Sequence, residues 1–256
     1  MLIVENLTIT ARMTRGARNI VDGLSFSAPY GETLGIVGQS GCGKTMTALS
    51  IFGLLPENCS AGGVAAIDGI DTIALPERAL AQMRGQKIAY IPQSGADFLN
   101  PSLKVKTHLY ETFSRLGIPR SRRHGFALSL LRSAAFEDPD AVMSKYPFQL
   151  SGGMAQRVVL ALGMAGNPSL VIADEPTRGI DRSTAVEFIE LLKTSFKNAV
   201  VIIITHDISI AKLCDKLLVM HSGTMAEYGC AGEVIENPVS EHTRRLVAAT
   251  PERWGS

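Results

Sequence analysis

Two hydrophobic periods alternate along the chain, and together they predict its elements. The segments 2–9 and 20–28 alternate apolar and polar residues, as half-buried strands do. Other segments are short, mostly apolar runs, which is typical of strands covered on both faces. These runs lie at 33–37, 87–91, 169–174, 199–205 and 216–223, and a strand with its turn is expected at 65–69.

Helical patterns separate the later strands. A helix at 46–55 follows the first apolar run, and Pro56 is expected to end it. Further helices are predicted at 182–196 and 208–214. Strands alternating with helices favour a parallel sheet covered by helices. A block from about Ser94 to Gly166 is helical throughout, so we interpret it as an inserted subdomain.

Composition excludes several classes of protein. A length of 256 residues is enough for a real core with one or two subdomains. The net charge of +1 gives no electrostatic case for binding nucleic acid. The longest apolar run is too short for a membrane span, and the first residues lack a secretory signal. Four scattered cysteines without metal-like spacing are typical of a reduced cytosolic protein.

The segment "GQSGCGKT" matches the phosphate-binding loop G-x-x-x-x-G-K-[ST] between a strand and a helix. Its glycines let backbone N–H groups close around phosphates, Lys44 reaches the β- and γ-phosphates, and Thr45 can ligate Mg²⁺. For Cys42 inside the loop, a small space-filling role is favoured over a redox switch. The predicted phosphate contacts are Gly38, Gln39, Ser40, Gly41, Cys42, Gly43, Lys44 and Thr45.

Polar residues follow three of the apolar strands. Asp174 and Glu175 end the run "LVIADEP", where the first can hold Mg²⁺ and the second can polarise a water attacking the γ-phosphate. His206 follows 199–205, and Gln93 follows 87–91. Ligands sit at the carboxyl edge of parallel strands, so we expect all four beside the nucleotide.

A second anion site is predicted at "LSGGMAQR". Ser151 can cap the helix that starts there, while Gly152 and Gly153 leave backbone amides uncovered. A bare helix N-terminus with its positive dipole attracts anions. The chain therefore carries two phosphate sites far apart in the sequence.

These motifs, in this order and spacing, resemble those of ABC-type ATPases, with Ser151 lying 23 residues before Asp174. The resemblance covers essentially the whole chain. It implies an α/β phosphate-loop NTPase (RecA-like) fold: a parallel-sheet core, an N-terminal antiparallel β subdomain and an inserted α-helical subdomain. It divides one domain, 1–256, into a core with the β subdomain (1–93 and 167–236), a helical subdomain (94–166) and a C-terminal tail (237–256).

The resemblance also implies roles and partners. Two such domains pair head to tail, so the signature turn would bind the γ-phosphate of the partner's ATP. Gln93 is similar to the glutamine that senses the γ-phosphate, Glu175 to the catalytic base and His206 to the switch histidine. The implied signature and interdomain contacts are Ser151, Gly152, Gly153, Met154, Gln156 and Asp181; the implied Mg²⁺ residues are Thr45, Gln93 and Asp174.

Two segments depart from the family pattern. The loop that usually reads Ser-Ala-Leu-Asp is Arg178-Gly179-Ile180-Asp181 here, so contacts across the dimer are expected to differ. The aromatic ring that usually stacks on adenine is missing near the N-terminus. The guanidinium of Arg12 or Arg15 could stack instead, and simple packing is an equal alternative.

Finer resemblance indicates a branch of the family. The segment 94–103, Met154 and the ending 237–251 are similar to dipeptide, oligopeptide and nickel importers, most of all the nickel-importer subunit. Cys230 is unaccompanied, so no iron–sulfur cluster is expected. The implied partners are a second ATPase subunit (a paralogue rather than a second copy), membrane permease subunits and, indirectly, an extracytoplasmic substrate-binding protein. The implied location is the cytoplasmic face of the inner membrane, with no nucleic acid bound.

Two surface segments have open interpretations. Phe98, Leu99 and Leu103 are candidate contacts for the membrane subunit, with core packing as an equal alternative. The basic run 119–124 is expected to be a solvated loop rather than a lipid site. The rival functions are a soluble ABC ATPase acting on DNA or ribosomes, an exporter subunit and a kinase-like phosphotransferase, the last of which leaves "LSGGMAQR" unexplained.

Overall fold

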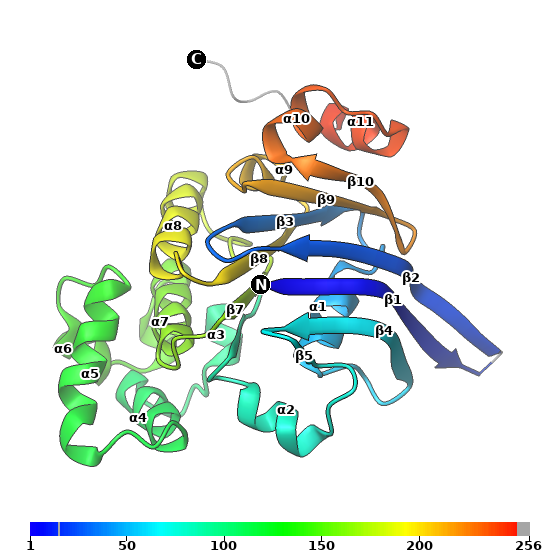
Figure 1. Cartoon of the computed structure of the whole chain (residues 1–256). Coiled ribbons are helices and arrows are strands. Elements are labelled where there is room, and N and C mark those ends of the chain that lie inside the picture. Colours follow the sequence, from blue (N-terminus) through cyan, green and yellow to red (C-terminus); the bar gives the residue numbers. More distant parts are fainter. Residues whose placement is uncertain (15, 250–256) are drawn as a thin grey trace.

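The computed structural model describes residues 1–14 and 16–249, which build two sheets and a group of helices (Figure 1). The first sheet is antiparallel, with strand order β2-β1-β4-β5. It consists of β1 (Leu2–Met13), β2 (Gly16–Ala28), β4 (Cys59–Ile67) and β5 (Ile70–Asp71). The antiparallel β subdomain that the family resemblance implies is therefore confirmed.

The second sheet has the order β10-β9-β3-β8-β7-β6 and carries the site. Its strands are β3 (Thr33–Gly38), β6 (Ile88–Ile91), β7 (Leu170–Asp174), β8 (Val200–Thr205), β9 (Lys216–His221) and β10 (Thr224–Cys230). All neighbours pair in parallel except β10, which is antiparallel to β9. The predicted parallel core is confirmed, with an antiparallel edge strand added to it.

Both faces of this sheet are buried, which explains the continuous apolar runs. Along β8, Ile202 and Ile204 pack in one core cluster with the antiparallel sheet and α1 (Lys44–Phe52). Val201 and Ile203 pack in the other cluster, beneath the helices of the opposite face. Because successive strand residues point to opposite faces, the positions along the middle of such a strand are apolar.

The helices fall into two groups. The helical block holds α3 (Gly95–Phe98), α4 (Val105–Arg115), α5 (Arg120–Ser133), α6 (Pro139–Ser144) and α7 (Gly152–Met164), and α4, α5, α6 and α7 gather on one side of the sheets (Figure 1). The others are α2 (Glu77–Met83), α8 (Arg182–Ser195), α9 (Ile208–Ala211), α10 (Ala231–Glu236) and α11 (Glu241–Ala248). Among the described residues, no helix has the length and apolar character needed to cross a bilayer.

Two expectations about local structure are wrong. The helix after the phosphate loop ends at Phe52, before Pro56, because Gly53 adopts a left-handed conformation and its N–H bonds back to Leu49 and Ser50. The basic run 119–124 is helical from Arg120 onward rather than a loop, since it forms the first turns of α5. Most of its side chains are nevertheless exposed, as predicted.

The helical block is held by buried side chains that join the core on one face of the parallel sheet, and by a close approach of α3 to α7. Phe113 of α4 is fully buried, with its ring centroid 4.9 Å from that of Phe126. Gly95 of α3 lies against α7, where a Cβ would come within 2.7 Å of the Ala155 carbonyl carbon. This approach packs the segment after Gln93 onto the helix that carries the signature turn.

Candidate nucleotide site

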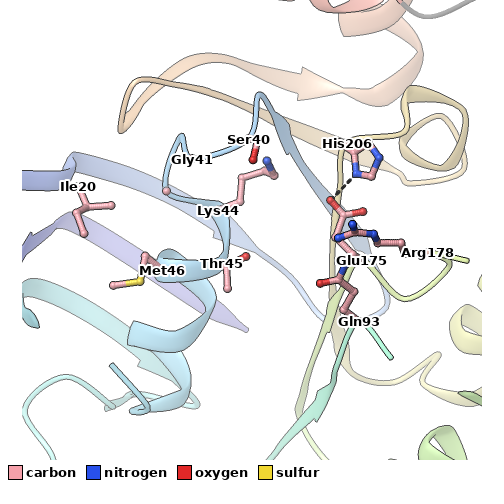
Figure 2. Close-up of a pocket in the computed structure, with 11 residues that line it drawn as sticks. Ile20, Ser40, Gly41, Lys44, Thr45, Met46, Gln93, Glu175, Arg178 and His206 are labelled. Carbon is pink, nitrogen blue, oxygen red and sulfur yellow. Dashed lines mark hydrogen bonds and ion pairs between the residues drawn. The ribbon is translucent and has the colours of Figure 1, made fainter. Parts of the chain in front are cut away.

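One pocket of about 470 Å³ lies at the carboxyl edge of the parallel sheet. The residues that line it come from the phosphate loop and α1, from the ends of β6, β7 and β8, and from β2 (Figure 2). They are Ile20, Ser40, Gly41, Gly43, Lys44, Thr45, Met46, Gln93, Glu175, Arg178 and His206. The structure thus brings together residues that are up to 186 positions apart in the sequence.

The phosphate loop wraps around the Lys44 ammonium. Lys44 Nζ donates hydrogen bonds to the backbone carbonyls of Gly38 at 2.8 Å and Gln39 at 3.0 Å. Gly38 is held so closely that a Cβ would lie 2.3 Å from the Met220 carbonyl oxygen. Cys42 is buried, which fits the space-filling role favoured from the sequence. The loop therefore places a fixed cation where phosphate oxygens can bind.

Asp174 presents an oxygen that suits a divalent cation. Its Oδ2 accepts a hydrogen bond from the Tyr90 hydroxyl at 3.1 Å, while its buried Oδ1 has no hydrogen-bond partner among the described residues. Burial raises the pKa of Asp174, and the neighbouring Thr45 and Tyr90 hydroxyls partly oppose that rise. Mg²⁺ binds carboxylate and hydroxyl oxygens, so Thr45 and Asp174 fit the ion that the family implies.

Glu175 and His206 form a pair across the pocket. Nδ1 of His206 lies 2.7 Å from Oε1 of Glu175, and a carboxylate can only accept, so Nδ1 carries the hydrogen. Glu175 has a φ of 48°, and its N–H bonds to the Ile204 carbonyl at 2.8 Å. A left-handed non-glycine residue costs of order 1–3 kcal/mol and recurs at functional sites. In this conformation Glu175 lines the pocket, with its carboxylate against His206.

Gln93 contacts the loop that departs from the family pattern. With its amide oriented to satisfy both groups, the Gln93 side-chain oxygen accepts hydrogen bonds from Arg178 Nε at 3.0 Å and from Arg178 Nη1. Figure 2 shows both side chains on the side of the pocket that holds Glu175, opposite Lys44 and Thr45. At the end of the same loop, Asp181 caps α8. The backbone N–H of Thr184 is the main reason that the pKa of Asp181 is lowered to about 2.

The signature turn lies apart from this pocket. Ser151 caps α7 by accepting the Met154 N–H at 3.2 Å, as predicted, and no atom crowds a Cβ built on Gly152. Among the described residues, none of the turn lines the pocket around Lys44. Gln156 is buried and donates to the Pro92 carbonyl at 3.1 Å, so it ties α7 to the residue before Gln93. Its predicted contact with nucleotide remains a prediction.

Sequence reasoning missed four lining or supporting residues. Ile20 and Met46 lie at the far end of the pocket from His206 and give an apolar surface where a base could pack (Figure 2). Neither carries a sequence signal beyond hydrophobicity. In the sequence, Tyr90 is one residue of a predicted strand, and Arg178 is a departure from the family pattern. Arg12 is exposed on β1, and Arg15 lies outside the described residues.

Comparison with known proteins assigns the family. The model of the family described as "ABC transporter" matches residues 21–178, and the chain belongs to that family. It is 39% identical to the oligopeptide transport ATP-binding protein OppD of Salmonella typhimurium, over 98% of this chain and 76% of that protein. It is 34% identical to the metal-staphylopine import system ATP-binding protein CntD of Staphylococcus aureus, over 97% of this chain and 92% of that protein.

A solved structure shares the fold. The dimeric post-hydrolysis state of the ATP-binding cassette MJ0796, bound to ADP and Pi, matches with a TM-score of 0.78 and 27% identity. The match covers 90% of this chain and 99% of that cassette. The expected ATPase class and the cassette fold are thereby confirmed.

Proposed function

We propose that this chain is the ATP-binding and ATP-hydrolysing subunit of an importer that takes up nickel, a metal chelate, or di- or oligopeptides through separate membrane subunits. The observation that carries the proposal is the pocket in which Lys44 and Thr45 face the Glu175–His206 pair. Asp174 lines the neighbouring cavity, which shares Thr45 and Gln93 with this pocket. Its relatives OppD and CntD, which are named for oligopeptide transport and metal-staphylopine import, support the importer branch.

Each residue of the pocket has its own proposed role in ATP binding and hydrolysis. Lys44 and the loop amides hold the β- and γ-phosphates, and Glu175 takes a proton from the attacking water. His206 holds the Glu175 carboxylate in place through the 2.7 Å contact. Mg²⁺, held by Thr45 and Asp174 with Gln93 nearby, would supply charge neutralisation on the phosphates.

The proposal includes a second ATPase subunit. The signature turn, Ser151 to Gly153, lies outside the pocket of its own chain. We infer that it binds the phosphates of a nucleotide held in the pocket of a second subunit. The dimeric state named for MJ0796 supports such pairing. We propose a paralogue rather than a second copy, as in the importers that the sequence resembles.

Membrane subunits are the other proposed partners. Phe98, at the end of α3, is 55% exposed, whereas Leu99 is buried in the core, so of the two only Phe98 is free to contact a permease. The chain would lie at the cytoplasmic face of the inner membrane. A substrate-binding protein outside the membrane would act on it only indirectly.

Uptake in a strain lacking this chain tests the proposal. Radiolabelled nickel, with and without a chelator, and a labelled dipeptide would be compared, each with wild-type and Glu175→Gln complementation. We expect one of these cargoes to be lost and to return only with the wild type. Unchanged uptake of all three would overturn the proposed substrate classes.

The purified protein gives a second test. Loss of a general base typically costs about 10²–10⁴-fold in rate, so Glu175→Gln should turn over ATP at no more than a few per cent of the wild-type rate while still binding it. The control is Glu187→Gln, an exposed carboxylate on α8 whose side chain lies 3.6 Å from Arg157 and outside the pocket. Near-normal turnover by Glu175→Gln would contradict its role as the base.

A further inference from the structure

Arg178 is a cation in the pocket without an acidic partner. Among the described residues no carboxylate lies within ion-pair distance of its guanidinium, and the neutral Gln93 amide is its side-chain partner. Lys44, in contrast, is held by the backbone carbonyls of Gly38 and Gln39. Arg178 is therefore a pocket cation whose side-chain partner is a neutral amide.

Backbone hydrogen bonds shape the loop that carries Arg178. The Arg178 N–H bonds to the Glu175 carbonyl at 3.1 Å, and the Ile180 N–H bonds to the Thr177 carbonyl at 3.2 Å. These turns come directly after the strained Glu175, and the Arg178 side chain lies on the side of the pocket that holds the catalytic pair (Figure 2). It lines the same cavity as Lys44 and Thr45.

Gln93 accepts the hydrogen bonds that Arg178 donates. It lines both the nucleotide pocket and a neighbouring cavity of about 720 Å³ that extends to Asp97 and Phe98 of α3. The residue before it is fastened to α7 through Gln156. The position of the Gln93 side chain is thus connected to the helical block, while Arg178 belongs to the loop after the catalytic strand.

We propose that Arg178 is a positioning residue that exchanges partners with the state of the nucleotide, an inference that rests on the proposed ATPase function. Without a γ-phosphate, Arg178 holds the Gln93 amide. With ATP bound, the γ-phosphate takes the guanidinium, because the phosphate carries negative charge and can accept two parallel hydrogen bonds from an arginine, whereas the Gln93 oxygen is neutral. Gln93 is then free of Arg178 and could help to hold Mg²⁺ where that ion is bound, and with ADP the Arg178–Gln93 pair re-forms.

The test measures ATP and ADP affinity separately by calorimetry, in a Glu175→Gln background that does not turn over. We expect Arg178→Ala to weaken ATP binding about tenfold or more, as the loss of a hydrogen bond to a charged group implies. The same change should weaken ADP binding less than about twofold. Arg178→Lys, which keeps the charge without the bidentate fork, should recover part of the ATP affinity. The charge-matched control is Arg122→Ala on the exposed start of α5.

A double-mutant cycle isolates the exchange itself. In EDTA, where no metal links Gln93 to the phosphates, Gln93→Ala should tighten ATP binding because the competing partner of Arg178 is gone. In the Arg178→Ala background the same change should have no effect. Equal losses for ATP and ADP, or additive effects of the two substitutions, would overturn the proposal. Nucleotide binding is measured without membranes, so failure of the importer assignment would show separately, in the uptake assay.

Discussion

At the scale of single residues, Asp174 illustrates what the sequence could and could not predict. Its place at the end of an apolar strand was enough to predict a metal-binding carboxylate. The tyrosine that orients it could not be predicted, since Tyr90 lies 84 positions away and reads as one more member of an apolar strand. The contact exists because β6 and β7 pair in parallel, with Tyr90 opposite Ile172. Arg178 was missed for a similar reason, because its partner belongs to another strand end.

Tyr90→Phe should weaken Mg²⁺ binding at the site without unfolding the protein. The ring still packs against Phe52, with centroids 5.5 Å apart, but Asp174 loses a hydrogen bond that lowers its pKa. Loss of a group that orients a metal ligand typically costs about 10–100-fold in metal affinity, so the Mg²⁺ concentration for half-maximal ATPase activity should rise about tenfold.

The same variant has a predicted pH dependence. The carboxyl of Asp174 must lose its proton to bind Mg²⁺, and burial already raises its pKa; Tyr90→Phe raises it further. The Mg²⁺ requirement should therefore increase more steeply in the variant as the pH falls. Tyr228→Phe, which removes a hydroxyl bonded to the Ser27 carbonyl, is the matched control. An unchanged Mg²⁺ titration for Tyr90→Phe would refute this role.

At the scale of elements, the strands were easier to predict than the helices. Strands buried on both faces consist mainly of apolar residues, so β7 and β8 can be recognised from their composition. The start of α5 could not be recognised in this way, because three arginines at a helix N-terminus oppose the helix dipole. Tertiary contacts compensate: Arg123 Nε donates to the Ile118 carbonyl at 2.9 Å, and His124 lies 3.7 Å from Asp140 of α6.

Phe113→Ala should destabilise the helical block. Phe113 is fully buried between Phe126 and Tyr110, and removing such a ring costs about 3–5 kcal/mol through lost burial and a residual cavity. For a chain of this size the melting temperature should fall by about 6 °C or more. Phe148→Ala is the control, since that ring is 74% exposed, and a fall of the same size in both variants would contradict the buried core.

At the scale of the whole molecule, the fold was predictable because its motifs mark the strand ends. The phosphate loop, Glu175 and His206 each follow a strand of one sheet, and parallel pairing places those ends together. The position of the signature turn was also implied by the family resemblance. The residues that face the base were not predictable, because Ile20 comes from β2 of the other sheet and meets Met46 of α1 only through tertiary folding.

Nucleotide binding should stabilise the whole chain, and Lys44→Ala should abolish that stabilisation. ATP at about 100 times its Kd contributes roughly 2.7 kcal/mol, which corresponds to a rise in melting temperature of about 5–10 °C. Lys44 also bonds to the carbonyls of Gly38 and Gln39 within the loop, so the variant's own melting temperature will change as well. The decisive quantity is therefore the difference between melting curves with and without ATP. Lys212→Ala, an exposed lysine after α9, should keep the full rise. A rise of normal size in Lys44→Ala would mean that the loop is not the principal phosphate site, and the assignment of the pocket would fail with it.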